Sequence, residues 1–287
     1  MVEMPTESEP VRVVQGDCLE VLRTLPDASV DAVITDPPYP CIKREYGYWT
    51  EAEWFDLVNP VVEQCRRVLK PAGSAVFVLQ PNSERVGRMR TWLWEFMAKW
   101  GREWGMVQDM WWWNTETMPG DWGGLCRSSL KACVWLGASS CYRDQDSVLW
   151  GESERNKAMR LVARANRSSP SGRTINNQRA GEAALRRGGV TPFNVFPTGG
   201  CNRWSNGGGA HGHGASTPTS LCRWWVRYIC PSGGVVLDPF LGSGTVALAA
   251  LAEGRKAIGI ERQPPYADIA RRRVLEAMGT GLLAGVG

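Results

Sequence analysis

The sequence predicts an α/β fold with a mainly parallel sheet and an irregular insertion. Two observations support the sheet: residues 11–39 alternate between strand and helix patterns, and residues 234–278 do so again. A third supports the insertion, because residues 142–190 lose the apolar periodicity and become rich in Ser, Arg, Asn and Gly. The expected division is one body, residues 1–110 and 191–287, and an insertion, residues 111–190.

The first half of the chain begins with a strand, a helix and a buried strand. That second strand ends on Asp36, which is followed by Pro37, Pro38 and Tyr39. A helix with a proline interruption, a strand, an amphipathic helix and two Trp-rich strands come next. We expect the tryptophans there, Trp111, Trp112 and Trp113 among them, to pack in the core. The expected bounds are 11–17, 18–26, 31–35, 52–73, 74–80, 86–104, 106–114 and 131–138.

The second half ends in a strand, a Gly-rich turn, a helix, a strand and a helix. In the turn "DPFLGSGT", Gly242 and Gly244 allow the backbone to approach a ligand, toward which the helix N-terminal amides point. The turn lacks the P-loop lysine and the full G-x-G-x-x-G pattern. Glu261 ends the next strand, where doubly wound folds bind ribose hydroxyls. This pattern predicts a cofactor that contains a nucleoside, with a generic βαβ turn as the alternative. The expected bounds are 218–230, 234–238, 245–254, 256–261 and 266–278.

Charge is distributed unevenly along the chain. The net charge is +4, but residues 155–190 contain nine basic residues and one acid, Glu182, so this segment is +8 and the remainder is −4. Arginine dominates the segment, and its planar fork suits phosphate. We therefore expect an anionic polymer as the partner, with a solvated loop as the alternative. The expected nucleic-acid contacts are Arg155, Lys157, Arg160, Arg164, Arg167 and Arg173.

The cysteine and histidine pattern favours an intracellular, cytoplasmic protein without a structural metal. The nine cysteines are scattered and include no C-x-x-C pair. His211 and His213 lie among three of them, but the spacing matches no common zinc pattern. We also expect no signal peptide and no membrane span, because the start is acidic and no apolar run is long enough.

Two motifs together resemble a known family. "TDPPYP" at residues 35–40 resembles the catalytic motif of amino-group DNA methyltransferases, and "DPFLGSGT" resembles their S-adenosylmethionine loop. The catalytic motif comes first, which resembles the β class of these enzymes. The resemblance implies a circularly permuted Rossmann-like methyltransferase sheet. It also implies that residues 111–190 form a target-recognition region.

Further segments match this family over most of the chain outside residues 142–190. "GDCLEVL" and "RRVLKPAGSAVFV" resemble the segments that flank the catalytic strand. "WWWNTETMP" resembles the family's W-N-K segment, with Thr115 in place of lysine. "HGASTPTSL" resembles the stretch before the cofactor loop, although only His213 and Pro218 of its H-P-T-Q-K-P pattern persist.

The resemblance implies that the protein methylates the exocyclic amine of a flipped-out base in double-stranded DNA, and that the tetrapeptide Asp36–Tyr39 holds this amine. Asp36 would accept one amino hydrogen, the Pro37 carbonyl the other, and Tyr39 would stack on the base. Pro37 and Pro38 would fix the direction of these acceptors. S-Adenosyl-L-methionine would be the cofactor. The implied cofactor contacts are Asp17, Cys18, Asp36, Asp238, Pro239, Phe240, Gly242, Ser243, Gly244, Thr245, Glu261 and Arg262.

The residue before Pro-Pro-Tyr bears on which base is methylated. Family members that methylate adenine at N6 usually have Asp or Asn before Pro-Pro-Tyr, whereas N4-cytosine enzymes more often have Ser. Asp36 therefore favours N6-adenine, with N4-cytosine as the first alternative. RNA and protein methyltransferases usually place the cofactor motif first, and a DNA-binding relative without turnover is a further alternative. A homodimer and a paired restriction enzyme are left open.

Overall fold

The computed structural model describes residues 2–45, 47–115, 129–150, 182, 186–198 and 217–279. The chain divides into two compact units, Met1–Arg143 with Asn194–Gly287 and Asp144–Phe193. The expected boundary at residue 110 differs from this division, because the strands that follow it belong to the first unit's sheet. The described part of the second unit contains the short 3₁₀ helix η1 (Asp146–Val148) and an antiparallel bridge between Trp150 and Val190.

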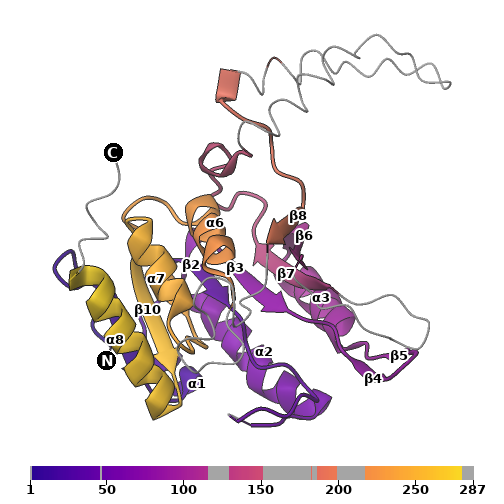
Figure 1. Ribbon diagram of the computed structural model, residues 1–287. Helices are drawn as coiled ribbons and strands as arrows, with labels where there is room; N and C mark the ends of the chain where they lie inside the picture. The colour runs from indigo at the N-terminus through magenta and orange to yellow at the C-terminus, as the bar shows by residue number, and fades with distance from the viewer. Residues whose placement is uncertain are drawn as a thin grey trace. The chain divides into compact units, whose positions relative to one another are not determined.

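An eight-stranded sheet runs through the first unit in the order β1-β10-β9-β2-β3-β7-β6-β8 (Figure 1). The strands from β1 to β3 in this order are parallel, which confirms the predicted parallel sheet. β7 is antiparallel to both β3 and β6, and β8 is parallel to β6. The strands are β1 (Val11–Gln15), β2 (Val30–Thr35), β3 (Leu69–Leu79), β6 (Met106–Asn114), β7 (Leu130–Gly137), β8 (Val195–Thr198), β9 (Val235–Asp238) and β10 (Lys256–Glu261).

Helices cover both faces of this sheet. Figure 1 shows α6, α7 and α8 side by side over one face, whereas α1, α2 and α3 pack on the other. β3 alternates between the two layers, as a strand buried on both faces must. The helices are α1 (Cys18–Thr24), α2 (Glu51–Val68), α3 (Trp92–Glu103), α6 (Thr219–Ile229), α7 (Thr245–Ala252) and α8 (Pro264–Gly279).

Tryptophans fill much of the core on both faces. Trp54 of α2 meets Trp92 of α3 edge to face, with ring centroids 4.8 Å apart. On the opposite face Trp135 of β7 meets Trp225 of α6 at 5.5 Å. Trp112 is buried as predicted, but the core prediction is wrong for Trp113, which is 47% exposed. The two are neighbours on one strand, so their side chains point to opposite faces.

The prediction of a helix over residues 86–104 is wrong at the N-terminal end. Residues 83–89 instead form a hairpin of β4 (Ser83–Arg85) and β5 (Arg88–Met89), and α3 begins at Trp92. Gly87 has a φ of +76° at the hairpin tip, a conformation that a helix does not allow. The helix predicted over residues 52–73 ends earlier, at Val68, and it continues through Pro60 without a break.

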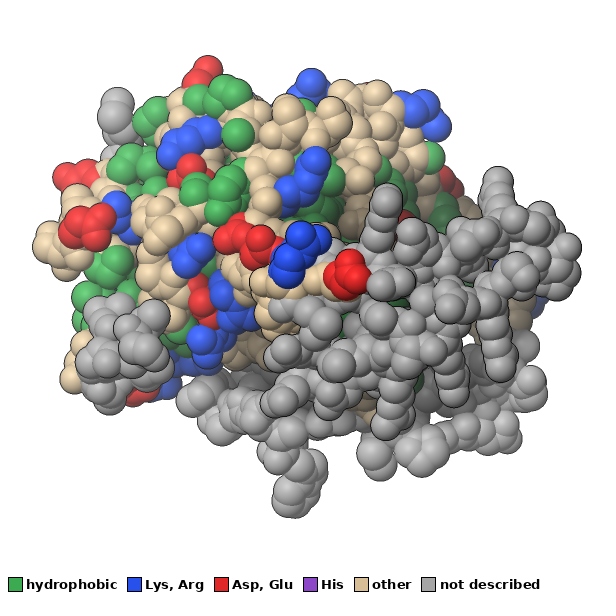
Figure 2. Space-filling view, turned by 90° about the horizontal axis from the view of Figure 1, so that it is seen from above, with side chains coloured by type: hydrophobic (Ala, Val, Ile, Leu, Met, Phe, Trp, Pro, Cys, Tyr) green, Lys and Arg blue, Asp and Glu red, His purple; other side chains and the backbone are tan. Residues whose placement is uncertain are grey.

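The described surface has mixed charge. In the face seen in Figure 2, acidic and basic side chains alternate over the described residues without a large area of one sign. The strongly basic segment that begins at Arg155 lies outside the described residues as far as residue 181, and so do His211 and His213. Among the helices that the structure describes, none is long and apolar enough to cross a membrane. The described residues also hold no cluster of metal-ligating side chains.

Candidate active site

The strand that ends in the tetrapeptide lies beside the strand that ends in the Gly loop. β2 pairs with β9 through Ala32 and Val33, so Asp36 and Asp238 leave the sheet at the same edge. A side-chain hydrogen bond of 2.6 Å from Thr35 Oγ1 to Asp238 Oδ1 links the two ends. The predicted meeting of the two motifs at the carboxyl ends of adjacent strands is thus confirmed.

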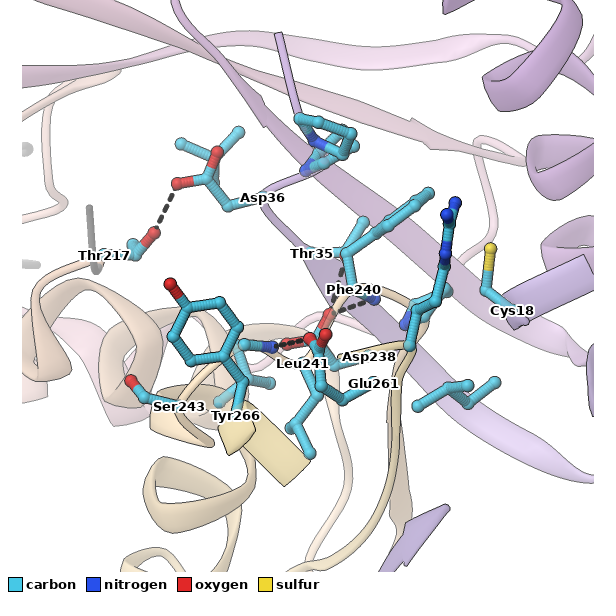
Figure 3. A pocket seen from close by; sticks show the side chains of 18 of the residues that line it. Cys18, Thr35, Asp36, Thr217, Asp238, Phe240, Leu241, Ser243, Glu261 and Tyr266 are labelled. Atoms are coloured by element: carbon cyan, nitrogen blue, oxygen red, sulfur yellow. Dashed lines mark hydrogen bonds between the residues drawn. The ribbon is translucent and has the colours of Figure 1, made fainter. Parts of the chain in front are cut away.

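The carboxylate of Asp36 is held on both oxygens. The Tyr39 hydroxyl donates to Oδ1. Thr217 Oγ1 donates to Oδ2 at 2.7 Å (Figure 3). Thr217 precedes α6 in the chain, and its side chain is buried. Each carboxylate oxygen has a second lone pair, so the acceptor still has capacity for an incoming N–H group.

Two side-chain donors, one from buried Trp54 and one from half-buried Asn82, fix the backbone of the predicted catalytic loop, residues 36–40. Trp54 Nε1 donates to the Pro38 carbonyl at 2.6 Å, and Asn82 Nδ2 donates to the Pro40 carbonyl at 2.7 Å. Trp92 Nε1 in turn donates to Asn82 Oδ1 at 3.0 Å. No described residue donates to the Pro37 carbonyl. This carbonyl is therefore able to accept a further hydrogen bond, and its role as the second acceptor stays a prediction.

Lys131 of β7 adds a cation that sequence reasoning missed. Its Nζ donates to the Tyr39 hydroxyl at 3.2 Å and lies 3.9 Å from Asp36 Oδ2. The same ammonium lies 4.7 Å from the ring centroid of Trp112, which faces Lys131 across the β6–β7 pair. Contact with an aromatic face and a carboxylate stabilises the ammonium in a largely enclosed position.

The Gly loop has the geometry of a ligand-facing turn. Gly242 and Gly244 have φ of +54° and +89°, and Gly244 is the residue before α7. A Cβ at Gly244 would meet the Ala270 Cβ at 3.1 Å, so α8 also requires glycine there. Gly242 N donates to Glu261 Oε2 at 2.8 Å, and Gln263 N donates to Oε1 at 2.7 Å. Glu261 thus holds the loop in place as well as facing the cavity.

Burial affects the acids and thiols of the site. It raises the pKa of Asp238 from 3.8 to about 7, although the bonds from Thr35 and the Phe240 N–H lower it. It also raises the pKa of Glu261, against the effect of its amide donors. The pKa of the Cys18 thiol is raised to about 12 by burial, so Cys18 is a neutral wall residue. Asp17 Oδ1 caps α1 by accepting from Leu19 N at 2.9 Å.

One cavity brings the two motifs together. Its wall includes every predicted catalytic residue and every predicted cofactor contact except Gly244. The six predicted nucleic-acid contacts, Arg155 to Arg173, lie outside the described residues. The cavity also has lining residues that sequence reasoning missed. These are Ile34, Thr35, Ile42, Arg44, Trp49, Leu57, Val78, Gln80, Lys131, Thr217, Cys222, Leu241, Val246, Ile260, Gln263, Tyr266 and Gly16.

Little in the sequence indicates that these additional residues line the cavity. Lys131 and Thr217 lie 95 and 181 positions from Asp36, and only the sheet register and the start of α6 bring them to it. The T-P-T sequence at residues 217–219 is a helix start signal of the kind that sequence reasoning can use. It does not reveal that the first threonine faces a carboxylate.

The wall of the cavity fits S-adenosylmethionine. Glu261 offers a carboxylate for ribose hydroxyls, and Phe240 and Ile260 offer apolar surface for an adenine ring. Asp17 and Asp36 supply negative charge, which suits a sulfonium cation. The glycines at positive φ let backbone amides approach the ligand closely.

Known proteins support the same interpretation. Residues 30–272 match the N6_N4_Mtase family, described as DNA methylase. Type II methyltransferase M.HinfI of Haemophilus influenzae is 26% identical over 284 residues, covering 92% of this chain and 68% of the relative. Type II methyltransferase M.ScaI of Streptomyces caespitosus is 27% identical over 282 residues, covering 93% and 82%.

Solved structures share the fold. PvuII DNA methyltransferase (cytosine-N4-specific) superposes with a TM-score of 0.69 at 21% identity, covering 97% of this chain and 94% of that one. The M1.HpyAVI–SAM complex gives 0.58 at 17% identity, covering 92% and 98%. The chain belongs to the N6/N4 DNA methylase family and is an S-adenosylmethionine-dependent amino DNA methyltransferase.

Proposed function

We propose that this protein methylates N6 of adenine in double-stranded DNA, on a base turned out of the helix. The observation that supports adenine is the carboxylate of Asp36 at the first position of the tetrapeptide, beside the Pro37 carbonyl. Family members with Asp or Asn at this position usually act on adenine. The exocyclic amine of adenine carries two N–H groups, and these two neighbouring acceptors match it.

The two acceptors address the main chemical difficulty of the reaction. The lone pair of the amine is delocalised into the ring, so the nitrogen is a weak nucleophile. Hydrogen bonds to Asp36 and to the Pro37 carbonyl favour a pyramidal nitrogen whose lone pair points away from both acceptors. S-Adenosylmethionine supplies an activated methyl group on its sulfonium. As nitrogen becomes positive, the Asp36 carboxylate stabilises that charge and is positioned to accept the proton that nitrogen loses.

The surroundings of the tetrapeptide prepare it for a base. Trp54 and Asn82 fix the loop carbonyls on either side of Tyr39. The Tyr39 ring offers a stacking surface that compensates for stacking lost when the base leaves the duplex. The hydroxyl of the same residue is held by Lys131 at 3.2 Å. A rigid acceptor pair next to a fixed ring lowers the cost of orienting the amine.

The test is nucleoside mass analysis of unmethylated DNA after incubation with labelled S-adenosylmethionine. N6-methyladenine is the expected product. Asp36→Ala should abolish transfer and leave the cofactor Kd, measured by calorimetry, within a factor of about two. If this variant lost cofactor binding and transfer equally, Asp36 would be a cofactor or folding residue, and the proposed role would be wrong.

N4-cytosine is the second candidate. It is favoured by the match to a structure named as cytosine-N4-specific, whose fold covers 97% of this chain. The exocyclic amine of cytosine presents the same two N–H groups to the same acceptors. N4-methylcytosine in the digest would therefore keep the mechanism and replace the base.

A further inference from the structure

The hairpin of residues 83–89 projects from the same edge of the sheet as the catalytic loop. β3 runs parallel to β2 with Thr35 opposite Phe77, so residues 80–90 leave the sheet where Asp36 does. Asn82 at the base of the hairpin is bonded to the Pro40 carbonyl at 2.7 Å. Arg90 N donates to the Asn82 carbonyl at 3.0 Å and closes the base of the hairpin. The hairpin is thus anchored directly to the catalytic loop.

Packing in the hydrophobic core does not account for this hairpin. All of its residues are exposed, including Val86 at 68% and Met89 at 48%. A two-stranded ribbon alone is only marginally stable in water. The hairpin therefore presents two exposed apolar side chains, Val86 and Met89, at the edge of the sheet where Asp36 lies.

The arginines of the hairpin lie in an arrangement that suits an anion. Arg85 and Arg88 are directly opposite each other in the β4–β5 pair, where like charges are destabilising. Arg88 forms an exposed ion pair with Glu84 at 3.0 Å, and such pairs contribute little. Arg85 has no ion-pair partner within the described residues. A phosphate near both guanidinium groups would offset their repulsion.

The distance along the ribbon sets the reach of these arginines. Arg85 lies three positions after Asn82, which corresponds to about 10 Å of strand. On a DNA strand this spans about three nucleotides at 3.4 Å each. Exposed Lys43 and Arg44 follow Pro40 on the catalytic loop, so further positive charge lies near the base of the hairpin.

We propose that the hairpin is a DNA-contacting arm. Arg85 and Arg88 bind backbone phosphates within about three nucleotides of the target base, and Val86 packs against the deoxyribose between them. The arm positions the duplex and does not read its sequence, because it contacts phosphate and sugar. The proposal rests on the proposed function, in which DNA is the substrate.

The test compares two double variants that remove equal charge. Arg85→Gln with Arg88→Gln changes the hairpin. Arg23→Gln with Arg102→Gln changes exposed arginines in the last turns of α1 and α3, where these helices lead away from the catalytic edge. The DNA Kd is measured at several salt concentrations. The hairpin variant should weaken binding at least tenfold and lower the slope of log K against log salt by about 2, one for each lost phosphate contact.

Two further measurements make the result specific. Melting temperature and cofactor Kd should match wild type in both variants, which shows that the fold is intact. Neutral methylphosphonate groups within about three nucleotides of the target should weaken the wild type and leave the hairpin variant unchanged. Equal slopes in the two double variants would overturn the arm and leave the proposed function intact. A wild type that neither binds nor methylates DNA would overturn both.

Discussion

At the scale of single residues, the Asp36 carboxylate is surrounded by groups from three parts of the chain. Tyr39 and Thr217 donate to it, and Lys131 places a cation 3.9 Å from Oδ2. The ammonium also holds the Tyr39 hydroxyl. Lys131 thus holds the Tyr39 hydroxyl and balances the negative charge of Asp36, which under the proposed function makes it a positioning residue.

We expect Lys131→Met to lower kcat by about 10- to 100-fold, the effect of losing a hydrogen bond from a charged donor. The cofactor Kd should stay within about twofold, because Lys131 contacts the catalytic loop. Lys131→Arg should recover part of the loss, since it restores a cation and a donor. Single-turnover rates and calorimetry measure both quantities. Equal kcat in the wild type and the Met variant would show that Lys131 has no part in the reaction.

At the scale of elements, the junction between β2 and β9 holds the site together. Asp238 is 4% exposed, and its Oδ1 accepts from both Thr35 and the Phe240 N–H. Burial raises its pKa from 3.8 to about 7, so the folded protein keeps a proton that the unfolded chain releases between these pH values. This group therefore makes the protein more stable at pH 4 than at pH 8.

We expect Asp238→Asn to remove this pH dependence. Asparagine keeps the Oδ1 acceptor and cannot ionise, whereas the wild type should lose on the order of a few kcal/mol of unfolding free energy as pH rises from about 4 to 7. Urea unfolding at pH 4 and pH 8 measures the difference. Asp268→Asn, which changes an exposed carboxylate on α8, is the control and should follow the wild type. Parallel curves for wild type and Asp238→Asn would contradict the raised pKa.

The elements differ in how well the sequence predicts them. β2, β9, β10 and α7 follow from their apolar patterns and glycines, because local periodicity and burial agree there. The hairpin before α3 could not be recognised in the same way, since Val86 and Met89 continue the apolar spacing of the helix. The position of Lys131 depends on the register between β7 and β6, and register is a property of the whole sheet.

At the scale of the whole molecule, charge is separated along the chain. Residues 155–190 carry +8 and the remainder carries −4. In the first unit, β7 ends at Gly137 opposite Ser74, near the start of the pairing between β3 and β2, so β7 ends at the edge of the sheet away from Asp36. We propose that the insertion supplies phosphate contacts and target recognition.

We expect Gln at Arg155, Lys157, Arg160, Arg164, Arg167 and Arg173 to weaken DNA binding in a salt-dependent way. If each residue neutralises one phosphate, the slope of log K against log salt falls by about 5. The cofactor Kd should not change, because the cavity is built from the first unit. A gel or filter binding series at several salt concentrations measures the slope. An unchanged slope would show that the segment does not contact DNA.

The pairing of β1 with β10 and of β2 with β9 also affects how the protein is made. Both N-terminal strands emerge from the ribosome first, and their partners follow more than 200 residues later. At about 5–20 residues per second, these apolar strands are synthesised about 10–50 s before their partner strands. Chain termination at any point before β10 therefore gives a product without an active site. During synthesis the exposed strand edges are natural targets for chaperones.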